Sequence, residues 1–489
     1  MLAQQFILSR GAIECPPGFA HAGLGAWELL TGPDLPVAVA RYEDEWLAVL
    51  GIAVDQDGKL VNQSRLDALA AEKSASFAAL ARFLADSAGR FAIVLVTPEG
   101  GKVYSDAVGS LGVVYDPETG AVGSTLNVVL TREPEPRRDF PFAEAARLGQ
   151  GRFAFGHTSD RAVRRLLPNH TLDLARFTIE RFWPTDEDTA LAEPTPEEEL
   201  AVIRGMGTRL EQVIATLAKD VNGPTLLPLT GGVDSRLLLA FSKPVLEDIS
   251  LFSHAEDILS RKDTRLAGFL GERVGKSVRV IDPLKGTCPL LEDPDVLTQK
   301  NLSYKIATGL EDTPTPVRHT VFQEHPAGGI VLRGNTAEFL KAVLWGRGVH
   351  ENNNKAHNIP TGVKKMMLGE DANLHPQIQA EYSEWYAGLP HLAALRPFDL
   401  MFAEHFLPRR LGNLFYGFTR NLYICPSNDR RFIAAATSLP PNKRQSMYYH
   451  EVLLNWRAPE LADIRHTRPR QNQLFDTLRN SDTVIPDLS

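Results

Sequence analysis

The stretch TLLPLTGGVDSR, from Thr225 to Arg236, decides the fold prediction for this chain. An apolar run over residues 225–229 leads directly into Gly231 and Gly232, and a helical pattern begins near Asp234. A buried strand that turns directly into a helix is the building unit of a parallel α/β sheet. Glycines at such a turn allow a ligand to approach the backbone closely.

The same stretch predicts an anion-binding site. The N–H groups and the dipole at the start of a helix favour a negative charge, and Thr230 and Ser235 add hydroxyl donors. Asp234 would repel a phosphate unless a Mg²⁺ ion lies between them. The loop is not of the Walker A type, because no Gly-Lys-Ser/Thr follows. The alternative is an ordinary strand–helix turn in which Asp234 caps the helix.

Alternating elements surround this stretch. Strands are expected at residues 249–253, 278–281 and 329–332, a helix at 262–274, and mostly helix towards Ser489. Asp257 and Asp263 flank a basic pair and are expected in solvent. Upstream, residues 186–194 resemble a linker, and Thr195, Pro196 and Glu198 predict a capped helix start. The alternation predicts a doubly wound parallel sheet with a helical C-terminal part.

The first 185 residues have a different pattern, which predicts antiparallel hairpins. Short apolar runs at residues 38–42, 46–52, 89–97, 102–106, 112–116 and 121–124 are separated by turn residues. A helical segment at residues 64–87 interrupts them. The sequence therefore predicts two domains, 1–188 and 189–489.

Composition excludes several protein classes. The 489 residues carry 52 Lys and Arg against 60 Asp and Glu, a net charge of −8, which argues against a nucleic-acid-binding protein. No apolar run approaches the roughly 20 residues that span a bilayer, and no signal peptide is recognisable. The three cysteines, Cys15, Cys288 and Cys425, form no disulfide or CxxC pattern, so a cytoplasmic protein is expected.

The loop from Leu229 to Arg236, LTGGVDSR, resembles the SGGxDSR pyrophosphate-binding loop of the asparagine synthetase family, which includes β-lactam synthetases and lasso-peptide cyclases. Further stretches match family motifs in order: residues 104–109, 114–115, 123–125, 156–158, 163–170, 181–184, 252–253, 263–267, 334–338 and 426–440. The resemblance implies a glutaminase-like (Ntn-type) α+β sandwich domain followed by an ATP pyrophosphatase-type synthetase domain.

The resemblance also implies a reaction and a set of ligand contacts. ATP would adenylate a substrate carboxylate with release of pyrophosphate, and an amine would then displace AMP. The residues implied to bind Mg²⁺-ATP are Thr230, Gly231, Gly232, Asp234, Ser235, Arg236, Leu251, Ser253 and Gly334, with Asp234 and Glu338 as metal ligands.

Three departures from the family pattern shape the prediction. Leu2 occupies the position of the glutaminase cysteine, so no glutaminase activity is expected. Asn335 lies at the family's acid–base position and an amide cannot exchange a proton, so Glu404 is the candidate base. No Lys follows Lys443, so Arg468 or Arg470 is the candidate to stabilise charge on the α-phosphate.

Two functions therefore remain open. The first is an amide ligase for a small-molecule or peptide carboxylate, with the β-lactam and macrolactam classes favoured over free amino acid plus ammonia. The second is a degenerate nucleotide-binding homologue that acts as a scaffold or regulator. Neither involves nucleic acid or membrane, and whether the chain forms a homodimer is left open.

Overall fold

The computed structural model describes residues 3–11, 14–72, 76–137, 153–255, 258–282, 326–345, 358–366, 375–414, 421–481, 483–486 and 488. Leu2, Asp257 and Cys288 lie outside the described residues. The chain packs as two compact units. Met1–Thr189 and Asn352–Thr419 belong to the first, and Ala190–Leu297, Pro316–Glu351 and Arg420–Ser489 to the second. The prediction of two domains gave residues 352–419 to the second domain, whereas these residues pack with the first unit.

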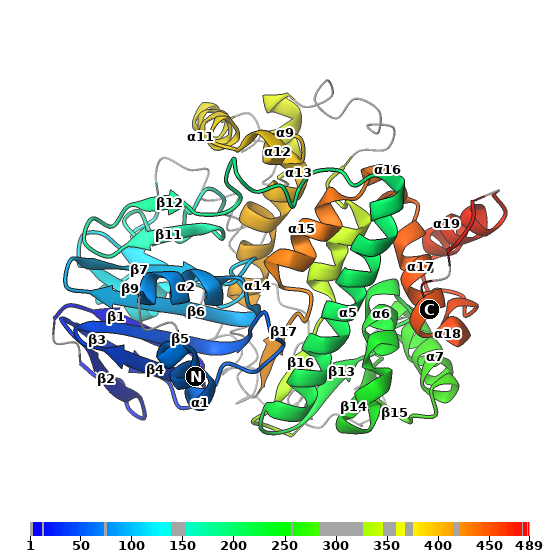
Figure 1. Cartoon of the computed structure of the whole chain (residues 1–489), viewed down its shortest axis with the longest axis horizontal. Helices are drawn as coiled ribbons and strands as arrows, with labels where there is room; N and C mark the ends of the chain where they lie inside the picture. Colours follow the sequence, from blue (N-terminus) through cyan, green and yellow to red (C-terminus); the bar gives the residue numbers. More distant parts are fainter. Residues whose placement is uncertain are drawn as a thin grey trace. The chain divides into compact units, whose positions relative to one another are not determined.

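Two antiparallel sheets form most of the first unit (Figure 1). Their strand orders are β10-β8-β9-β1-β3-β2 and β12-β11-β7-β6-β5-β4. The strands are β1 (Phe6–Ser9), β2 (Ala20–Leu24), β3 (Trp27–Thr31), β4 (Val37–Tyr42), β5 (Glu45–Val54), β6 (Ala88–Thr97), β7 (Gly100–Ser105), β8 (Val114–Asp116), β9 (Ala121–Gly123), β10 (Arg164–Arg165), β11 (His170–Asp173) and β12 (Ile179–Arg181).

The six strands expected from the apolar runs are confirmed as β4 to β9, with ends within two residues. The three strands before them were not predicted. They are four or five residues long, and β2 (AHAGL) is exposed over most of its length, so neither alternation nor an apolar run marks it. The predicted helix at 64–87 is two helices, α1 (Gln63–Glu72) and α2 (Phe77–Ala85), because the Ser76 side chain caps a new start.

Strand β6 shows how the layers of this unit are held together. Ala92 and Val94 face a core shared with β1 and β3 of the other sheet. Ile93 and Leu95 face a second core that includes side chains of α1 and α2. A strand buried on both faces is expected to be apolar throughout, as residues 91–96 are. The layering is therefore helices, sheet, sheet.

Further helices complete the first unit: α3 (Leu126–Val129), α9 (Ile359–Lys365), α11 (Pro376–Ala387), α12 (His391–Ala394), α13 (Pro397–Met401), the π-helix η6 (Phe402–Phe406) and α14 (Leu407–Leu414).

The second unit is built on a five-stranded parallel sheet with strand order β15-β14-β13-β16-β17 (Figure 1). Its strands are β13 (Thr225–Pro228), β14 (Ile249–His254), β15 (Val278–Ile281), β16 (Ile330–Leu332) and β17 (Leu422–Ile424). Its helices are α5 (Pro196–Asp220), α6 (Val233–Ser242), η1 (Lys243–Asp248), α7 (Ile258–Arg273), η5 (Asn335–Lys341), α15 (Arg430–Ser438), α16 (Pro441–Gln445), α17 (Tyr448–Arg457), α18 (Pro459–Ala462) and α19 (Pro469–Arg479).

The elements expected in this unit are confirmed. Thr195 caps α5 through a capping box with Glu198, and the strands at 225–229, 249–253, 278–281 and 329–332 are present. The chain is thus α/β in the broad sense, with antiparallel sheets in one unit and a parallel sheet in the other. In the described part of the chain, no helix has the length and apolar character needed to cross a bilayer.

The strand order creates a topological switch point at the centre of the parallel sheet. From β13 the chain proceeds to β14 and β15 on one side, while β16 and β17 lie on the other side. The segments that leave the carboxyl ends of β13 and β16 therefore diverge, and ligands of open α/β sheets bind in the crevice at such a point. The glycine loop follows β13, and the turn at Gly334 follows β16.

Candidate functional site

The glycine loop joins β13 to the ten-residue helix α6, whose N-cap is Gly232. Gly232 provides no side-chain cap, so the first turn of α6 begins without one. The Oγ atoms of Thr230 and Ser235 lie 2.9 Å apart, and Thr230 Oγ1 accepts from the Gly232 N–H at 3.2 Å. The two hydroxyls therefore hold the loop in its bend.

Asp263 and Thr467 clamp the same loop from outside. Asp263 Oδ1 accepts from the Gly231 N–H at 2.9 Å and from Thr467 Oγ1 at 2.5 Å. The Thr467 N–H also donates to the Gly231 carbonyl at 3.2 Å. A Cβ on Gly231 would lie 1.9 Å from Thr467 Oγ1, so this contact requires glycine. Asp263, expected in solvent, is instead part of the site.

Arg236, the last residue of the loop motif, holds the C-terminal segment in place. It is fully buried, and its guanidinium donates to the carbonyls of Leu461, Ile464 and Arg465. Burial lowers its pKa to about 10, which still leaves it charged at neutral pH. Its role is therefore to position residues 461–467 against α6, and direct contact with a nucleotide is not supported.

The turn after β16 packs directly on the glycine loop. Gly334 is the N-cap of η5, and a Cβ placed on it would lie 2.8 Å from the Cβ of Asp234. Because of this close approach, two segments a hundred residues apart in sequence meet at the switch point. The resemblance to the asparagine synthetase family implies that both segments belong to one site, and in the described structure the two segments are in contact.

Asp234 has two unlike carboxylate oxygens. Its Oδ2 accepts from Lys341 Nζ at 2.5 Å, whereas its buried Oδ1 has no hydrogen-bond partner among the residues that the structure describes. A buried oxygen without a donor is costly, and a metal ion or a ligand group would relieve that cost. The Asp234 carboxylate therefore fits a role as a metal ligand.

The surroundings of Asp234 suit Mg²⁺ bound together with a phosphate. Mg²⁺ characteristically uses one or two carboxylates together with substrate phosphates and water. Within the described ranges, no group of three or more His, Cys, Asp or Glu side chains could hold a metal ion by itself.

Helix η5 presents its polar residues on one face. A 3₁₀-helix has three residues per turn, so Asn335, Glu338 and Lys341 line up. All three are half-buried, while Thr336, Phe339 and their neighbours on the other faces are buried. Glu338 therefore shares a face with Lys341, which reaches Asp234. The role of Glu338 as a second metal ligand stays a prediction.

Strand β14 supplies the two remaining predicted nucleotide contacts. Leu251 and Ser253 are both buried, and Ser253 lies near the carboxyl end of the strand, beside β13 and β15. The Leu229 N–H donates to the carbonyl of Phe252 at 2.7 Å, which ties this strand end to the start of the glycine loop. A contact with a ligand here would be made through backbone atoms.

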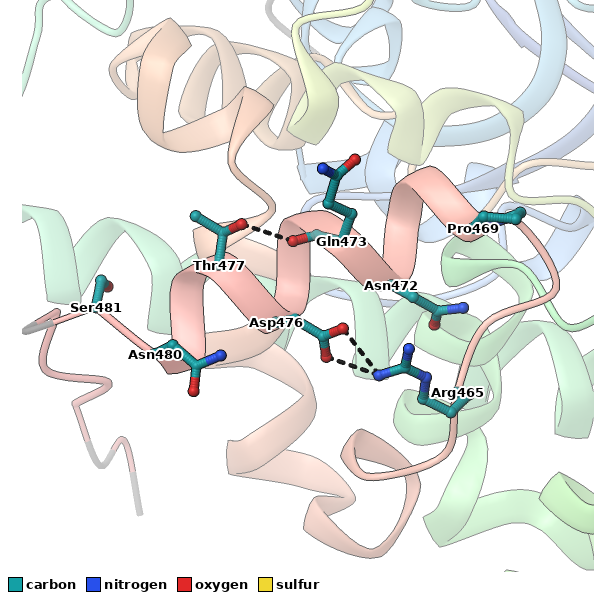
Figure 2. Close-up of a pocket in the computed structure, with 8 residues that line it drawn as sticks. All are labelled: Arg465, Pro469, Asn472, Gln473, Asp476, Thr477, Asn480 and Ser481. Carbon is teal, nitrogen blue, oxygen red and sulfur yellow. Dashed lines mark hydrogen bonds and ion pairs between the residues drawn. The ribbon is translucent and has the colours of Figure 1, made fainter.

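Arg468 and Arg470 lie at the start of α19, where both side chains are exposed. Arg468 follows Thr467 directly and is therefore next to the clamp on the glycine loop. A shallow, open groove of about 700 Å³ runs along α19. In Figure 2, Arg465 Nη1 donates to both carboxylate oxygens of Asp476, at 2.8 and 2.9 Å. The groove residues are Arg465, Pro469, Asn472, Gln473, Asp476, Thr477, Asn480 and Ser481.

Glu404, the candidate base, lies in η6 of the first unit and is fully enclosed. Arg181 donates to both of its oxygens at 2.5 and 2.9 Å, Trp385 Nε1 donates at 2.8 Å and Asn169 at 3.1 Å. Burial alone would raise its pKa, but the charge and hydrogen bonds of Arg181 outweigh burial and lower it to about 2. A carboxylate this acidic and enclosed is a poor base, so its role is structural.

Sequence reasoning missed two residues of the site. Asp263 lies in one of the stretches that resemble the family, residues 263–267, but it was expected in solvent and was given no role in the site. Lys341 lies three residues after Glu338, a spacing that aligns the two side chains if a 3₁₀-helix follows the turn. Knowing that helix type was necessary to identify Lys341.

Comparison with other proteins adds no further assignment to this geometry. No model of a known protein family matches the chain, and no curated protein matches it either.

Proposed function

We propose that the protein is an ATP-dependent amide-bond-forming ligase that adenylates a substrate carboxylate and releases pyrophosphate. The observation that carries this proposal is the glycine loop at the switch point, where helix α6 starts without a side-chain cap beside the half-satisfied carboxylate of Asp234. This arrangement suits a metal-bound polyphosphate, because it combines a helix N-terminus with a hard oxygen ligand.

Each part of the site would have a defined task. The loop backbone at Gly231 to Asp234 would cradle the departing pyrophosphate, and Asp234 with Glu338 would hold Mg²⁺, which neutralises charge on the phosphates. Asp263 and Thr467 would keep the loop and the C-terminal segment together. Arg468, which is exposed next to this clamp, is retained as the candidate cation for the α-phosphate. Arg470, two residues further along, is retained beside it. Catalysis would then be mainly positioning and charge stabilisation.

The proposed substrates follow from the same resemblance and from the groove. A carboxylate would accept AMP from ATP, and an amine on the same molecule would displace it, as in β-lactam or macrolactam formation. The groove along α19 offers the side-chain amide of Gln473 to a polar substrate, whereas the Asn472 amide is bonded to the His466 backbone and the Thr477 hydroxyl donates to the Gln473 carbonyl. We further propose that the two units correspond to a glutaminase-like domain without its cysteine and a synthetase domain, as in the asparagine synthetase family.

A second function is favoured by one observation. With Glu404 committed to Arg181 and an amide at Asn335, neither position can supply a general base. A nucleotide-binding scaffold or regulator would need none, so this alternative is retained.

Product analysis separates the two functions. The purified protein would be incubated with Mg²⁺-ATP and candidate carboxylates, and pyrophosphate exchange and AMP would be measured, with Asp234→Asn as the matched control. AMP and pyrophosphate that disappear in the variant would support the ligase. Nucleotide binding without either product would support the scaffold, and ADP with phosphate would rule out adenylation.

A further inference from the structure

Lys341 contacts Asp234, the proposed metal ligand. It ends helix η5, seven residues after Gly334, and its Nζ lies 2.5 Å from Asp234 Oδ2. Both side chains are partly open, with exposed fractions of 14% for Lys341 and 26% for Asp234. The pair is thus a salt bridge within the candidate site, with access to solvent.

The pair leaves the carboxylate only half satisfied. Asp234 Oδ1 has no hydrogen-bond partner among the described residues, although the atom is buried. Gly334 packs against the Cβ of Asp234, which restricts how far the side chain can turn to find another donor. The unpaired Oδ1 atom is therefore available to bind a second cation.

A second cation bound to Asp234 would repel the Lys341 ammonium. Two positive charges about 4 Å apart repel strongly near a protein surface, where water screens them only in part, and a divalent ion repels more strongly still. Lysine has a flexible four-carbon stem and a compact charge, so its ammonium can move several ångströms to a new partner. A polyphosphate arriving with the metal would provide that partner.

The neighbouring histidine does not compete for this carboxylate. His450 on α17 is fully buried, and burial together with the charge of Lys341 lowers its pKa to about 3. Its ring is neutral near pH 7, so the ammonium of Lys341 remains the cation at Asp234 in the free protein.

We propose that Lys341 is an exchangeable counter-ion, which neutralises Asp234 in the free protein and transfers to the polyphosphate when Mg²⁺-nucleotide binds. The exchange is non-covalent: Asp234 gives up one cation and accepts another, and the ammonium keeps all its protons. The inference rests on the proposed function, and it gives the phosphates a lysine partner although no Lys follows Lys443 in the chain. It makes Lys341 a binding residue for the phosphates.

Replacing Lys341 tests the exchange, because the two effects expected have opposite signs. In Lys341→Met, Mn²⁺ without nucleotide should bind about tenfold more tightly, since the competing ammonium is gone. With Mg²⁺ present, the non-hydrolysable analogue α,β-methylene-ATP should bind about tenfold more weakly, since a phosphate contact is lost. Lys341→Arg, which keeps the charge, should retain most of the nucleotide affinity. Mn²⁺ binding is followed by electron paramagnetic resonance and nucleotide binding by calorimetry, on the full chain.

Lys243→Met is the matched control, because Lys243 makes an exposed ion pair of the same length with Glu460 in the same unit. It should change neither measurement. If Lys341→Met is poorly folded by circular dichroism, Lys341→Gln is measured in its place with the same expectations.

The outcomes also separate this inference from the proposed function. Metal and nucleotide affinities that change in the same direction, or not at all, in a chain that binds nucleotide would overturn the exchange and leave the ligase proposal standing. Failure of the wild-type chain to bind the analogue would instead refute the proposed function. In that case the Mn²⁺ measurement still decides whether Lys341 and a metal compete for Asp234.

Discussion

Two ion pairs of equal length occupy the two units and have opposite characters. Arg181–Glu404 in the first unit and Lys341–Asp234 in the second each have an N–O distance of 2.5 Å. Glu404 is fully buried and every oxygen has donors, whereas Asp234 is 26% exposed and one oxygen has no partner in the described structure. A satisfied, enclosed pair holds a fold together, while a half-satisfied, accessible pair can exchange partners for a ligand.

The strongest test of this comparison is Glu404→Gln. Removing one partner of a buried ion pair leaves an uncompensated charge on Arg181, so we expect a loss of about 3–5 kcal/mol in the free energy of unfolding. Urea unfolding followed by tryptophan fluorescence measures it, since Trp385 donates to Glu404. Glu180→Gln, which breaks an exposed pair with Lys102, is the control and should cost less than about 1 kcal/mol. Wild-type stability with loss of pyrophosphate exchange would restore Glu404 as a base.

Acid should weaken the first unit through the same residue. The pKa of Glu404 is lowered to about 2 from the ordinary value of 4.5, so its stabilisation is complete above pH 4.5 and is lost as pH falls towards 2. The loss is about 3 kcal/mol, at 1.36 kcal/mol for each pKa unit. Unfolding free energies measured between pH 5 and 2 should fall less steeply in Glu404→Gln than in the wild-type chain. Equal slopes in the wild-type chain and in Glu404→Gln would mean that Glu404 does not cause the loss of stability in acid.

Gly231→Ala tests the clamp on the loop. Its Cβ would overlap Thr467 Oγ1 and displace the C-terminal segment, so we expect nucleotide binding to weaken at least tenfold, about 1.4 kcal/mol. Calorimetry with the non-hydrolysable analogue measures the change. Gly205→Ala, in α5 with no atom within 4 Å of the new Cβ, should leave binding unchanged and add about 0.5–1 kcal/mol of stability. Unaltered binding in Gly231→Ala would mean that Thr467 does not control the loop.

The smallest expected effect on stability belongs to Asp234→Asn. An accessible ion pair contributes about 0–1 kcal/mol, so its unfolding free energy should stay within about 1 kcal/mol of the wild-type value. Pyrophosphate exchange should nevertheless disappear in this variant. We therefore expect Glu404→Gln to lose stability and Asp234→Asn to lose activity with little change in stability. A large loss of stability in Asp234→Asn would mean that the Lys341–Asp234 pair also holds the fold together.

Much of the second unit follows from local sequence. The run at residues 225–236 predicts the strand, the turn and the helix, because an apolar strand, two glycines and a helical period are local signals. The same holds for the Thr195 capping box. Residues 104–109 and 334–338 could be proposed as parts of larger motifs, but their sequence carries no information on their partners.

The sequence by itself determined the α/β character, the near-residue-189 boundary and the candidate loop, since each depends on neighbours along the chain. Only the tertiary structure decided that Glu404 is enclosed by Arg181, that Asp263 clamps Gly231 and that Lys341 reaches Asp234. The reason is physical: exposure and the number of donors around a carboxylate are set by segments distant in sequence. The sequence shows a glutamate at position 404, but not which donors surround it, so it cannot distinguish a general base from one half of a buried ion pair.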